Sequence, residues 1–396
     1  MITIRTIDQL SIAPGDRVFY RVDYNVPLEG SRITDATRIE ETLPTLLMLR
    51  ERGAAIILAS HLGRPKGERK EKYSLRPVRD KLAELIDKDV QWADDCVGAE
   101  AESKASGLKP GEMLLLENLR FHPGEEKNDR AFAEQLRKLG TSYVNDAFGA
   151  CHRAHASIDA LPRLYPKEKT AGGLLLAKEL QFLQKVTNAS ERPFVALLGG
   201  AKIAGKIEPL EALVKLADTV LIGGGMANTF LAASGIPMGG SLVDTDSISV
   251  AKRILAESAG ALLAVPVDVV VAESLENPTK IEVVDVVNGL SDAQKAFDIG
   301  PRTISEFANA IAKAKTIFWN GPMGVFEKEP FAKGTMAMAR AIAGANAISI
   351  VGGGESVEAV KASGFAERIS HISTGGGASL EFIAGESLPG VEVLRD

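Results

Sequence analysis

The stretch VALLGGAKIAGKIEPLEALVKL, residues 195–216, decides how this chain is expected to fold. Its first four residues are apolar and predict a buried strand, and apolar residues return at helical spacing from Leu210 onward. The glycine pair between these two patterns permits a tight turn. A strand, a glycine loop and a helix start together point backbone N–H groups at one spot, which suits an anion. Lys202 and Lys206 would add positive charge there, so the stretch predicts a phosphate-binding loop.

The same loop nearly matches a P-loop, the phosphate-binding motif of many nucleotide hydrolases. Gly200 is followed, after four residues, by Gly205 and Lys206, as that motif requires. The match fails at Ile207, which stands where a Ser or Thr should hold the metal ion. The residues of the loop therefore leave the kind of phosphate site open.

Length and composition are those of a soluble globular protein with two domains. The 396 residues exceed one ordinary domain, 45% of them are hydrophobic and 25% are charged. A net charge of −6 argues against a nucleic-acid-binding protein, and two cysteines are too few for a disulfide framework. The N-terminal residues lack the apolar segment of a secretory signal, and the most apolar run, residues 341–354, is shorter than the ~20 residues of a membrane span. We therefore expect a cytoplasmic protein with no nucleic-acid or membrane partner.

Strand and helix patterns alternate along the chain. Helical spacing covers residues 39–49, 76–85, 132–139 and 174–186. The predicted strands are residues 17–22, 54–59, 113–116 and 142–144 in the first half, and 194–198, 219–222, 262–271, 316–319 and 347–351 in the second. This alternation predicts an α/β protein whose parallel sheets are covered by helices. Ligands of such sheets bind at the carboxyl ends of the strands, so the loops that follow the strands are candidate sites.

The loops after the first-half strands carry arginine and histidine. Arginine binds carboxylate and phosphate oxygens in pairs, so several arginines at neighbouring strand ends indicate a small, multiply anionic ligand. His152 and His155 could also ligate a metal ion together, but no further ligand pattern accompanies them and hydrogen bonding to an anion is preferred. The set consists of Arg21, Asp23, Asn25, Arg38, His61, Arg64, Arg120, His152, Arg153 and His155.

The loops after the second-half strands are rich in glycine and suit a nucleotide, because only glycine lets backbone approach phosphates closely. The triplets at residues 223–225 and 352–354 both lack the third glycine of a dinucleotide-binding fingerprint. A triple glycine is also as typical of tight packing as of a ligand site. Glu355 follows the second triplet, where it could meet a phosphate-bound Mg²⁺ or could simply be an acid favoured at a helix N-terminus.

Taken together, the motifs resemble those of the phosphoglycerate kinase family. The matching stretches follow the family's order and cover nearly the whole chain: RVDYNVP, HLGRP, ENLRFHPGEEKND, NDAFGACHRAHAS, LGGAKI, IGGGMANTF, VPVDVVVA, DIGPRT, WNGPMGVFE, VGGGES and STGGGASLEF. The resemblance implies a glycolytic and gluconeogenic phosphotransferase that moves a phosphoryl group between 1,3-bisphosphoglycerate and ADP, giving 3-phosphoglycerate and ATP. It also implies Mg²⁺ on the nucleotide, and a monomer, since the family is mostly monomeric.

The resemblance further implies two Rossmann-like lobes, each a parallel sheet flanked by helices, joined by a hinge helix. The expected divisions are residues 1–172 for the N-terminal, phosphoglycerate-binding lobe and 173–187 for the helix between the lobes. Residues 188–375 are expected to form the C-terminal, nucleotide-binding lobe, and residues 376–396 a tail that returns to the first lobe.

Carried over by position, the resemblance assigns residues to each part of the site. The substrate-binding residues are Asp23, Asn25, Arg38, His61, Arg64, Arg120, His152, Arg153 and His155. The nucleotide-binding residues are Gly200, Ala201, Lys202, Lys206, Gly225, Asn320, Pro322, Glu327, Gly353, Gly354, Glu355 and Ser356. Arg38, Lys202 and Lys206 are the catalytic residues, and Glu355 meets Mg²⁺ through the nucleotide phosphates. The acceptor is a carboxylate, already ionised at neutral pH, so lobe closure and charge neutralisation suffice without a general base.

The chain departs from the family pattern at three places. Gly205 and Glu355 stand where the family usually has Asp, and Ala150 and Cys151 stand where Thr and Ala are common. We interpret Cys151 as a buried packing residue rather than a reactive thiol near the substrate. Two alternatives follow: a P-loop-like nucleotide hydrolase, or a metabolite-binding protein with the kinase fold and impaired catalysis, which Gly205 and Glu355 would favour.

Overall fold

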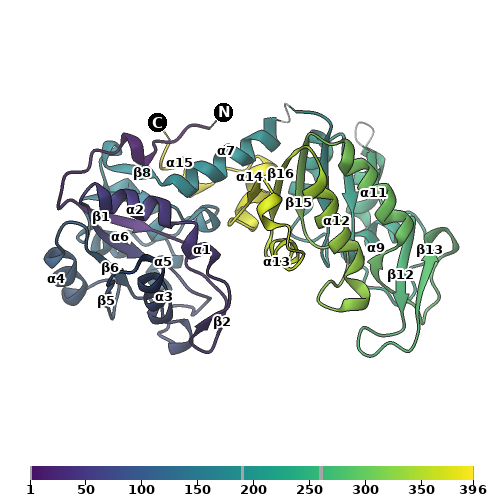
Figure 1. Ribbon diagram of the computed structural model, residues 1–396, viewed down its shortest axis with the longest axis horizontal. Helices are drawn as coiled ribbons and strands as arrows, with labels where there is room; N and C mark the ends of the chain where they lie inside the picture. Colours follow the sequence, from purple (N-terminus) through teal and green to yellow (C-terminus); the bar gives the residue numbers. More distant parts are fainter. Residues whose placement is uncertain (1, 189–190, 258–261, 396) are drawn as a thin grey trace. The chain divides into compact units, whose positions relative to one another are not determined.

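The computed structural model describes residues 2–188, 191–257 and 262–395. The backbone divides into two compact units (Figure 1). Unit 1 comprises Met1–Gln181 together with Ser387–Asp396, and unit 2 comprises Phe182–Glu386. Each unit is an α/β domain with its own six-stranded sheet and its own hydrophobic core.

The sheet of unit 1 is parallel throughout, with the strand order β5-β6-β4-β1-β7-β8. Its strands are β1 (Arg17–Arg21), β4 (Ala55–Ala59), β5 (Gln91–Ala93), β6 (Met113–Leu116), β7 (Ser142–Asn145) and β8 (Thr170–Gly172). Every residue of β4, β6 and β7 is buried, which is typical of a parallel sheet covered on both faces. The edge strands β5 and β8 are three residues long each and were not predicted from the sequence.

The helices of unit 1 pack their apolar residues onto this sheet. They are α1 (Thr37–Glu40), α2 (Leu43–Glu51), α3 (Arg76–Ile86), α4 (Ala99–Gly107), α5 (Pro123–Glu126) and α6 (Arg130–Arg137), and β2 (Leu28–Glu29) and β3 (Arg32–Ile33) form a short hairpin. The single helix predicted for residues 39–49 is wrong, because the chain breaks into α1 and α2 at Thr42. Pro44 explains the break, since proline has no N–H to donate and is tolerated only in a first helical turn.

The main sheet of unit 2 is also parallel, with the order β11-β10-β9-β15-β16-β17. Its strands are β9 (Phe194–Leu198), β10 (Thr219–Ile222), β11 (Leu262–Ala264), β15 (Thr316–Asn320), β16 (Ile348–Gly352) and β17 (His371–Ile372). The helices are α8 (Ile207–Leu216), α9 (Gly224–Ala233), α10 (Ile248–Glu257), α11 (Pro301–Lys313), α12 (Lys333–Gly344), α13 (Gly354–Ala362) and α14 (Gly377–Ala384). The stretch that opened the sequence analysis forms β9, a glycine loop and α8, as predicted.

Unit 2 contains a second, antiparallel sheet that the sequence did not predict. In it β12 (Asp268–Ala272) lies between β13 (Ile281–Asp285) and β14 (Lys295–Ile299). The single strand predicted for residues 262–271 is therefore wrong, because β11 belongs to the parallel sheet and β12 to the antiparallel one. Pro266 separates them, since it lacks an N–H for a sheet hydrogen bond and restricts the residue before it. Because apolar residues continue on both sides of Pro266, the sequence pattern does not show this change from one sheet to the other.

Helix α7 (Leu174–Asn188) starts against buried side chains of unit 1. The Asp146 carboxylate accepts a hydrogen bond from the Leu176 N–H at 2.8 Å and another from the Tyr20 hydroxyl at 2.6 Å. The Thr45 hydroxyl accepts one from the Leu174 N–H at 2.9 Å. Burial raises the pKa of Asp146 to about 6, although these hydrogen bonds oppose the shift. The first turn of α7 is thus held by a polar cluster inside the unit.

The two ends of the described chain lie side by side in unit 1 (Figure 1). The Arg5 N–H donates to the Leu394 carbonyl at 3.0 Å, and Ile4 pairs with Arg395 in an isolated bridge. The C-terminal segment includes α15 (Pro389–Glu392), where the Gly390 N–H donates to the Cys151 carbonyl at 3.0 Å. Among the helices that the structure describes, none is both long and apolar enough to cross a membrane.

The contact between Gly173 and Asp146 gives a stability prediction. A methyl group on Gly173 would lie 2.1 Å from the Asp146 carboxylate, whereas one on Gly107, at the end of α4, would meet no atom within 4 Å. We expect Gly173→Ala to lower the stability of the protein by roughly 1–3 kcal/mol through overpacking. Gly107→Ala, the matched control, should be neutral or slightly stabilising. Differential scanning calorimetry checks this; equal thermal midpoints for the two variants would contradict it.

Candidate active site

The polar loops of unit 1 follow four strands that are neighbours in the sheet, β6, β4, β1 and β7. Parallel strands end at the same edge, so the loops converge there. Asp23 follows β1, and its carboxylate accepts a hydrogen bond from the Arg38 guanidinium at 2.6 Å. His61, after β4, has its Nδ1 3.9 Å from the same carboxylate. The structure therefore brings Asp23, Arg38 and His61 together, although Arg38 lies in α1 and not in a loop at the end of a strand.

Asp23 is a buried carboxylate that remains ionised. Burial by itself would raise its pKa, but the nearby positive charges, Arg38 first among them, outweigh burial and lower the pKa of Asp23 to about 2. Asp23 also accepts a backbone hydrogen bond from the Asn25 N–H at 3.2 Å. Its charge fixes the guanidinium of Arg38, whose side chain is about one-third exposed.

His61 is held as a neutral imidazole. The Arg21 guanidinium lies 3.2 Å from its Nδ1, and because a guanidinium can only donate, Nδ1 accepts and Nε2 carries the proton. Burial lowers the pKa of His61 well below its ordinary value, and the charges of Arg120 and Arg21 act in the same direction. His61 therefore offers a neutral N–H donor.

Gly63 joins two of the predicted residues through its backbone. Its N–H donates to the Asn25 side-chain oxygen at 2.8 Å, and its carbonyl accepts from the Arg120 guanidinium at 2.8 Å. Arg120 is buried, and burial together with the charge of Arg21 lowers its pKa to about 10. Arg64 follows Gly63 with an exposed side chain. Asn25 and Arg120 thus shape the loop that presents His61 and Arg64.

The loop after β7 contributes the other two histidines. The Arg153 guanidinium donates to His152 Nε2 at 2.9 Å, so the proton of that imidazole lies on Nδ1. Burial and nearby arginines lower the pKa of His152, and lower the pKa of His155 to about 3. The Nδ1 atom of His155 is buried without a hydrogen-bond partner in the described part of the chain. For His152, a hydrogen bond with the Gly149 backbone opposes the lowering of its pKa. The two histidines also lie outside the cluster of potential metal ligands found among the described residues.

Cys151, in the same loop, is fully buried. Its thiol donates to the Ala147 carbonyl at 3.4 Å and lies 3.5 Å from the Asn145 amide. Burial raises the pKa of the Cys151 thiol to about 12, which disfavours the reactive thiolate. The contacts agree with the interpretation of this cysteine as a packing residue.

Unit 2 contains a cavity of about 630 Å³. Six of the residues predicted to bind nucleotide line it: Gly200, Ala201, Gly225, Pro322, Glu327 and Glu355. The other six do not line it: Lys202, Lys206, Asn320, Gly353, Gly354 and Ser356. The structure therefore assembles only part of the predicted set around one space.

The glycine loops beside this cavity pack backbone against backbone. A methyl group on Gly199 would lie 2.0 Å from the Pro322 carbonyl oxygen, and one on Gly224 would lie 2.8 Å from that of Gly200. The Gly200 N–H donates to the Pro322 carbonyl at 3.0 Å, and the Met226 N–H donates to the Gly200 carbonyl at 3.0 Å. The triplet at residues 223–225 is thus required for packing, whatever it binds.

Lys206 lies at the N-cap of α8 and is half-buried. Its ammonium group donates to the Gly199 carbonyl at 3.0 Å and to the Asn320 side-chain oxygen at 3.1 Å. Burial lowers the pKa of Lys206, while the negative charge of Glu355 opposes the shift. Lys202, by contrast, has an exposed side chain.

Two acids and a serine complete the predicted set. Glu355 is exposed in the first turn of α13, and Glu327 is exposed in the loop after β15. Ser356 is fully buried, and its hydroxyl accepts the Gly321 N–H at 2.5 Å. Ser356 therefore fixes the β15 loop instead of facing the cavity.

Sequence reasoning missed the apolar wall of the cavity. Val269 comes from β12, Phe297 and Asp298 come from β14, and Leu242 and Leu275 come from loops. Burial raises the pKa of Asp298 to about 7, while its carboxylate accepts the N–H groups of Gly334 and Ile299. No spacing signal marks these residues, because they come from the antiparallel sheet and from separate loops and meet only in the folded chain.

Comparison with known proteins gives one consistent result. The family model described as phosphoglycerate kinase matches residues 7–386. The chain belongs to the phosphoglycerate kinase family. The phosphoglycerate kinase of Moorella thermoacetica is 53% identical over 382 residues, covering 96% of each chain, and that of Solibacter usitatus is 51% identical over 398 residues, covering 99% of each. The solved phosphoglycerate kinase of Coxiella burnetii superimposes with a TM-score of 0.88 at 36% identity, covering 99% of each chain.

Family membership settles the activity and the fold. The chain is a phosphotransferase with the activity of a phosphoglycerate kinase, and the P-loop hydrolase alternative is not favoured. Its two parallel α/β units agree with the two-lobed solved relatives, which include the enzyme of Pyrococcus horikoshii at a TM-score of 0.88. The substrates of such an enzyme are 3-phosphoglycerate and ADP or ATP.

The low pKa of Asp23 gives a pH prediction. Its folded pKa of about 2 lies below the ordinary value of 3.8, so the carboxylate stabilises the fold above pH 4 and this contribution is lost as the pH falls through 2. We expect Asp23→Asn to cost roughly 2 kcal/mol at pH 7, with about half of the difference gone at pH 3. Denaturant unfolding followed between pH 6 and pH 3 measures this. A difference that stays constant over that range would contradict it.

Proposed function

We propose that unit 1 binds 3-phosphoglycerate or 1,3-bisphosphoglycerate, and that unit 2 binds ADP or ATP. The observation that carries the first part is the group of cationic and N–H-donating side chains after four neighbouring strands of one sheet. Its members are Asn25, Arg38, His61, Arg64, Arg120, His152, Arg153 and His155, with Asp23 as the acid that orients Arg38. Such donors suit carboxylate and phosphate oxygens.

The neutral histidines support an anion site rather than a proton-transfer site. A base that works at neutral pH needs a pKa near the working pH. The lowered pKa values of His61, His152 and His155 instead keep their imidazoles neutral, as donors of fixed hydrogen bonds. Buried polar atoms normally have a partner, so we propose that the buried Nδ1 atom of His155 is satisfied when the anion is bound.

The cavity of unit 2 supports the nucleotide half of the proposal. Its apolar wall, with Leu242, Val269 and Phe297, suits the flat face of a base. Glu327 lines the same cavity and would accept hydrogen bonds from a ribose. Gly200, Ala201 and Gly225 line the same space and allow backbone to approach phosphates. We include Pro322, Asn320, Gly353, Gly354 and Ser356 as residues that shape this site. Of these, Pro322 lines the cavity and Ser356 holds the β15 loop.

Glu355 fits the proposed contact with a nucleotide-bound Mg²⁺. Its carboxylate is exposed at the lining of the cavity, and Mg²⁺ prefers oxygen ligands, commonly one or two carboxylates besides phosphate oxygens. When bound there, Mg²⁺ would neutralise phosphate charge. The longer side chain of Glu, where the family usually has Asp, keeps the same ligand type.

We propose that catalysis is by positioning and charge neutralisation. The acceptor carboxylate is ionised at neutral pH and needs no base. Arg38 of unit 1 and Lys202 and Lys206 of unit 2 would surround the transferred phosphoryl group, whose charge is spread over its oxygens. Because these donors belong to different units, the reaction would require the two units to close around the substrates and exclude water. The remaining alternative is a metabolite-binding protein with impaired catalysis. Only Gly205 and Glu355 favour it.

The rest of the proposal concerns the location, the oligomeric state and the pathway of the protein. We propose a cytoplasmic monomer that works in glycolysis and gluconeogenesis. Both cysteines are free, as expected for a reducing compartment. A coupled assay with ATP and 3-phosphoglycerate tests the catalytic part of the proposal, because nucleotide binding without product would favour the metabolite-binding alternative.

The role of Lys206 is testable by substitution. Lys206→Ala should lower turnover by several orders of magnitude, because the positive charge that we propose to neutralise the transferred group is lost. Lys215→Ala, on an exposed position of the same helix, is the matched control and should leave turnover unchanged. Steady-state kinetics with saturating ATP and 3-phosphoglycerate measure both. Near-normal turnover of the Lys206 variant would remove this residue from the mechanism.

Arg38 gives the complementary test in unit 1. Arg38→Ala should lower turnover to a similar extent while ADP affinity, measured by isothermal titration calorimetry, changes less than about twofold, because the nucleotide is proposed to bind unit 2. Arg32→Ala, at an exposed arginine paired only with Glu29 among the contacts described, serves as the control. A large loss of ADP affinity in the Arg38 variant would place this residue in the nucleotide site instead.

A further inference from the structure

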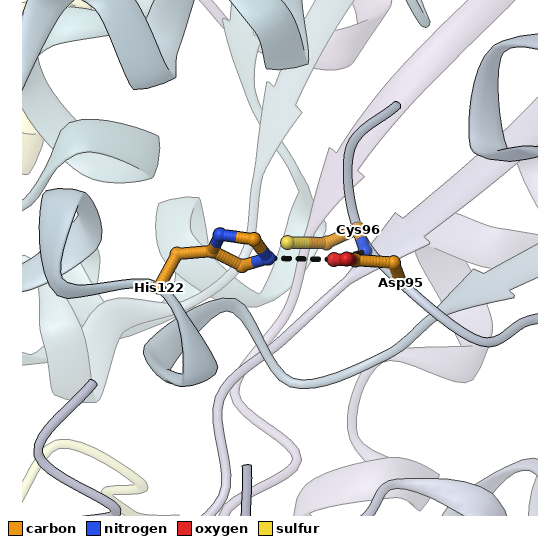
Figure 2. Close-up of side chains that lie close together, drawn as sticks. All are labelled: Asp95, Cys96 and His122. Carbon is orange, nitrogen blue, oxygen red and sulfur yellow. Dashed lines mark hydrogen bonds and ion pairs between the residues drawn. The ribbon is translucent and has the colours of Figure 1, made fainter. Parts of the chain in front are cut away.

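A second cluster of side chains that can bind a metal ion lies in unit 1, where the loop after β5 meets the start of α5. Asp95 and Cys96 follow β5, and His122 is the N-cap residue of α5. Figure 2 shows the thiol, the carboxylate and the imidazole pointing toward one another. One potential ligand atom from each of the three side chains lies within 4.8 Å of the others.

The contacts of the cluster bring all three groups close without filling their capacity to coordinate. His122 Nε2 lies 2.6 Å from an Asp95 carboxylate oxygen, and the same oxygen accepts the Cys96 N–H at 2.6 Å. The His122 ring stacks on Phe132 with its centroid 5.2 Å away, which fixes the plane of the imidazole. The side chains of Asp95 and His122 are 48% and 31% exposed, so an ion from solvent can reach these two ligands. Cys96 is fully buried and burial raises the pKa of its thiol, so binding to its sulfur requires the cation to displace the thiol proton.

The donor types select a class of ion. Sulfur, imidazole nitrogen and carboxylate oxygen together suit Zn²⁺ and similar borderline-soft cations, whereas Mg²⁺ and Ca²⁺ prefer oxygen alone. Ligand atoms of a tetrahedral Zn²⁺ stand about 3.3–3.8 Å apart, given bond lengths of about 2.0–2.3 Å. Separations of at most 4.8 Å are close enough to this value for small side-chain rotations to complete it.

We propose that Asp95, Cys96 and His122 form a binding site for Zn²⁺ or a cation of the same class, with the fourth position taken by water. Binding forms bonds from the cation to sulfur, nitrogen and oxygen. It breaks the hydrogen bond that His122 Nε2 donates to the Asp95 carboxylate. The Nε2 proton exchanges through solvent so that Nδ1 carries the one proton of the neutral imidazole, and the Cys96 thiol proton is released to solvent. No electron is transferred. The site is separate from the proposed contact between Glu355 and Mg²⁺, which belongs to unit 2.

A bound cation would join two segments that are distant in sequence. Helix α5, which His122 caps, carries Glu125, whose carboxylate accepts hydrogen bonds from Ser157, and Glu126, which lies 3.6 Å from the Arg120 guanidinium. Fixing the start of α5 to the loop after β5 would therefore stabilise unit 1 near Arg120. Because the cation would bind the folded state, the thermal midpoint should rise with its concentration.

The test uses Co²⁺ as a spectroscopic substitute for Zn²⁺ on the full-length protein. We expect a thiolate-to-cobalt charge-transfer absorption that saturates at one ion per chain and is displaced by Zn²⁺. Cys96→Ser should abolish it, whereas Cys151→Ser, at the only other cysteine of the chain, should retain it. His122→Gln should weaken the affinity at least tenfold.

Circular dichroism establishes that each variant is folded. Should Cys96→Ser fail to fold, His122→Gln and Asp95→Asn carry the test, since both of those side chains are partly exposed. The proposal is overturned if the wild-type protein gives no charge-transfer absorption, if Cys151→Ser alone abolishes it, or if His122→Gln and Asp95→Asn leave the affinity unchanged.

Discussion

Unit 1 depends on one buried charge, the guanidinium of Arg21 at the end of β1. Burying a charge is costly unless partners replace the water it loses. Arg21 donates to the Ser157 hydroxyl at 2.8 Å, lies 3.2 Å from His61 Nδ1 and lies 4.0 Å from the Glu125 carboxylate. These partners come from three separate segments, the loop after β4, helix α5 after β6 and the helical segment Ala156–Ala160 after β7, and Arg21 is 0% exposed. The need to satisfy this one group therefore determines where the loops after β4, β6 and β7 can lie.

Arg21 therefore positions residues of the proposed anion site although its own side chain is buried. It sets the tautomer of His61, and its charge helps to lower the pKa values of Arg120 and His155. Ser157, which it holds, is also bound by Glu125 through both its N–H and its hydroxyl. The side chains left facing outward, such as Arg38 and Arg64, are then available to an anion.

Unit 2 is organised differently, by close contact between backbones. The loops after β9, β10 and β15 hydrogen-bond to one another through Gly199, Gly200 and Gly224. Side chains at Gly199 and Gly224 would collide with carbonyl oxygens of the neighbouring loops. The glycine-rich motifs therefore have a structural cause as well as a proposed functional one. Lys206 stabilises the same region by donating to Gly199 and Asn320, which holds its ammonium group beside the loops.

The sequence predicted an element correctly where the whole apolar run belongs to a single strand of a single sheet. The central parallel strands, such as β9 and β6, are short apolar runs bounded by glycine or polar residues, and their ends were predicted to the residue. The prediction of one strand was wrong where an apolar run is divided between two sheets. This happens at Pro266, where the chain leaves the parallel sheet and enters the antiparallel one. The apolar wall of the cavity was missed for the same reason, because Val269 and Phe297 come from that second sheet.

By itself, the sequence determined the alternation of strands and helices, the motifs that identify the family, and which loops carry the polar residues of the site. These properties are local, since each depends on a few consecutive residues. Only the tertiary structure decided which of those residues meet, which become neutral, and which, like Arg21 and Ser356, are buried as supports. Such outcomes depend on desolvation and on hydrogen bonds between segments far apart in the chain, such as the pairs His61 with Arg21 and Gly321 with Ser356.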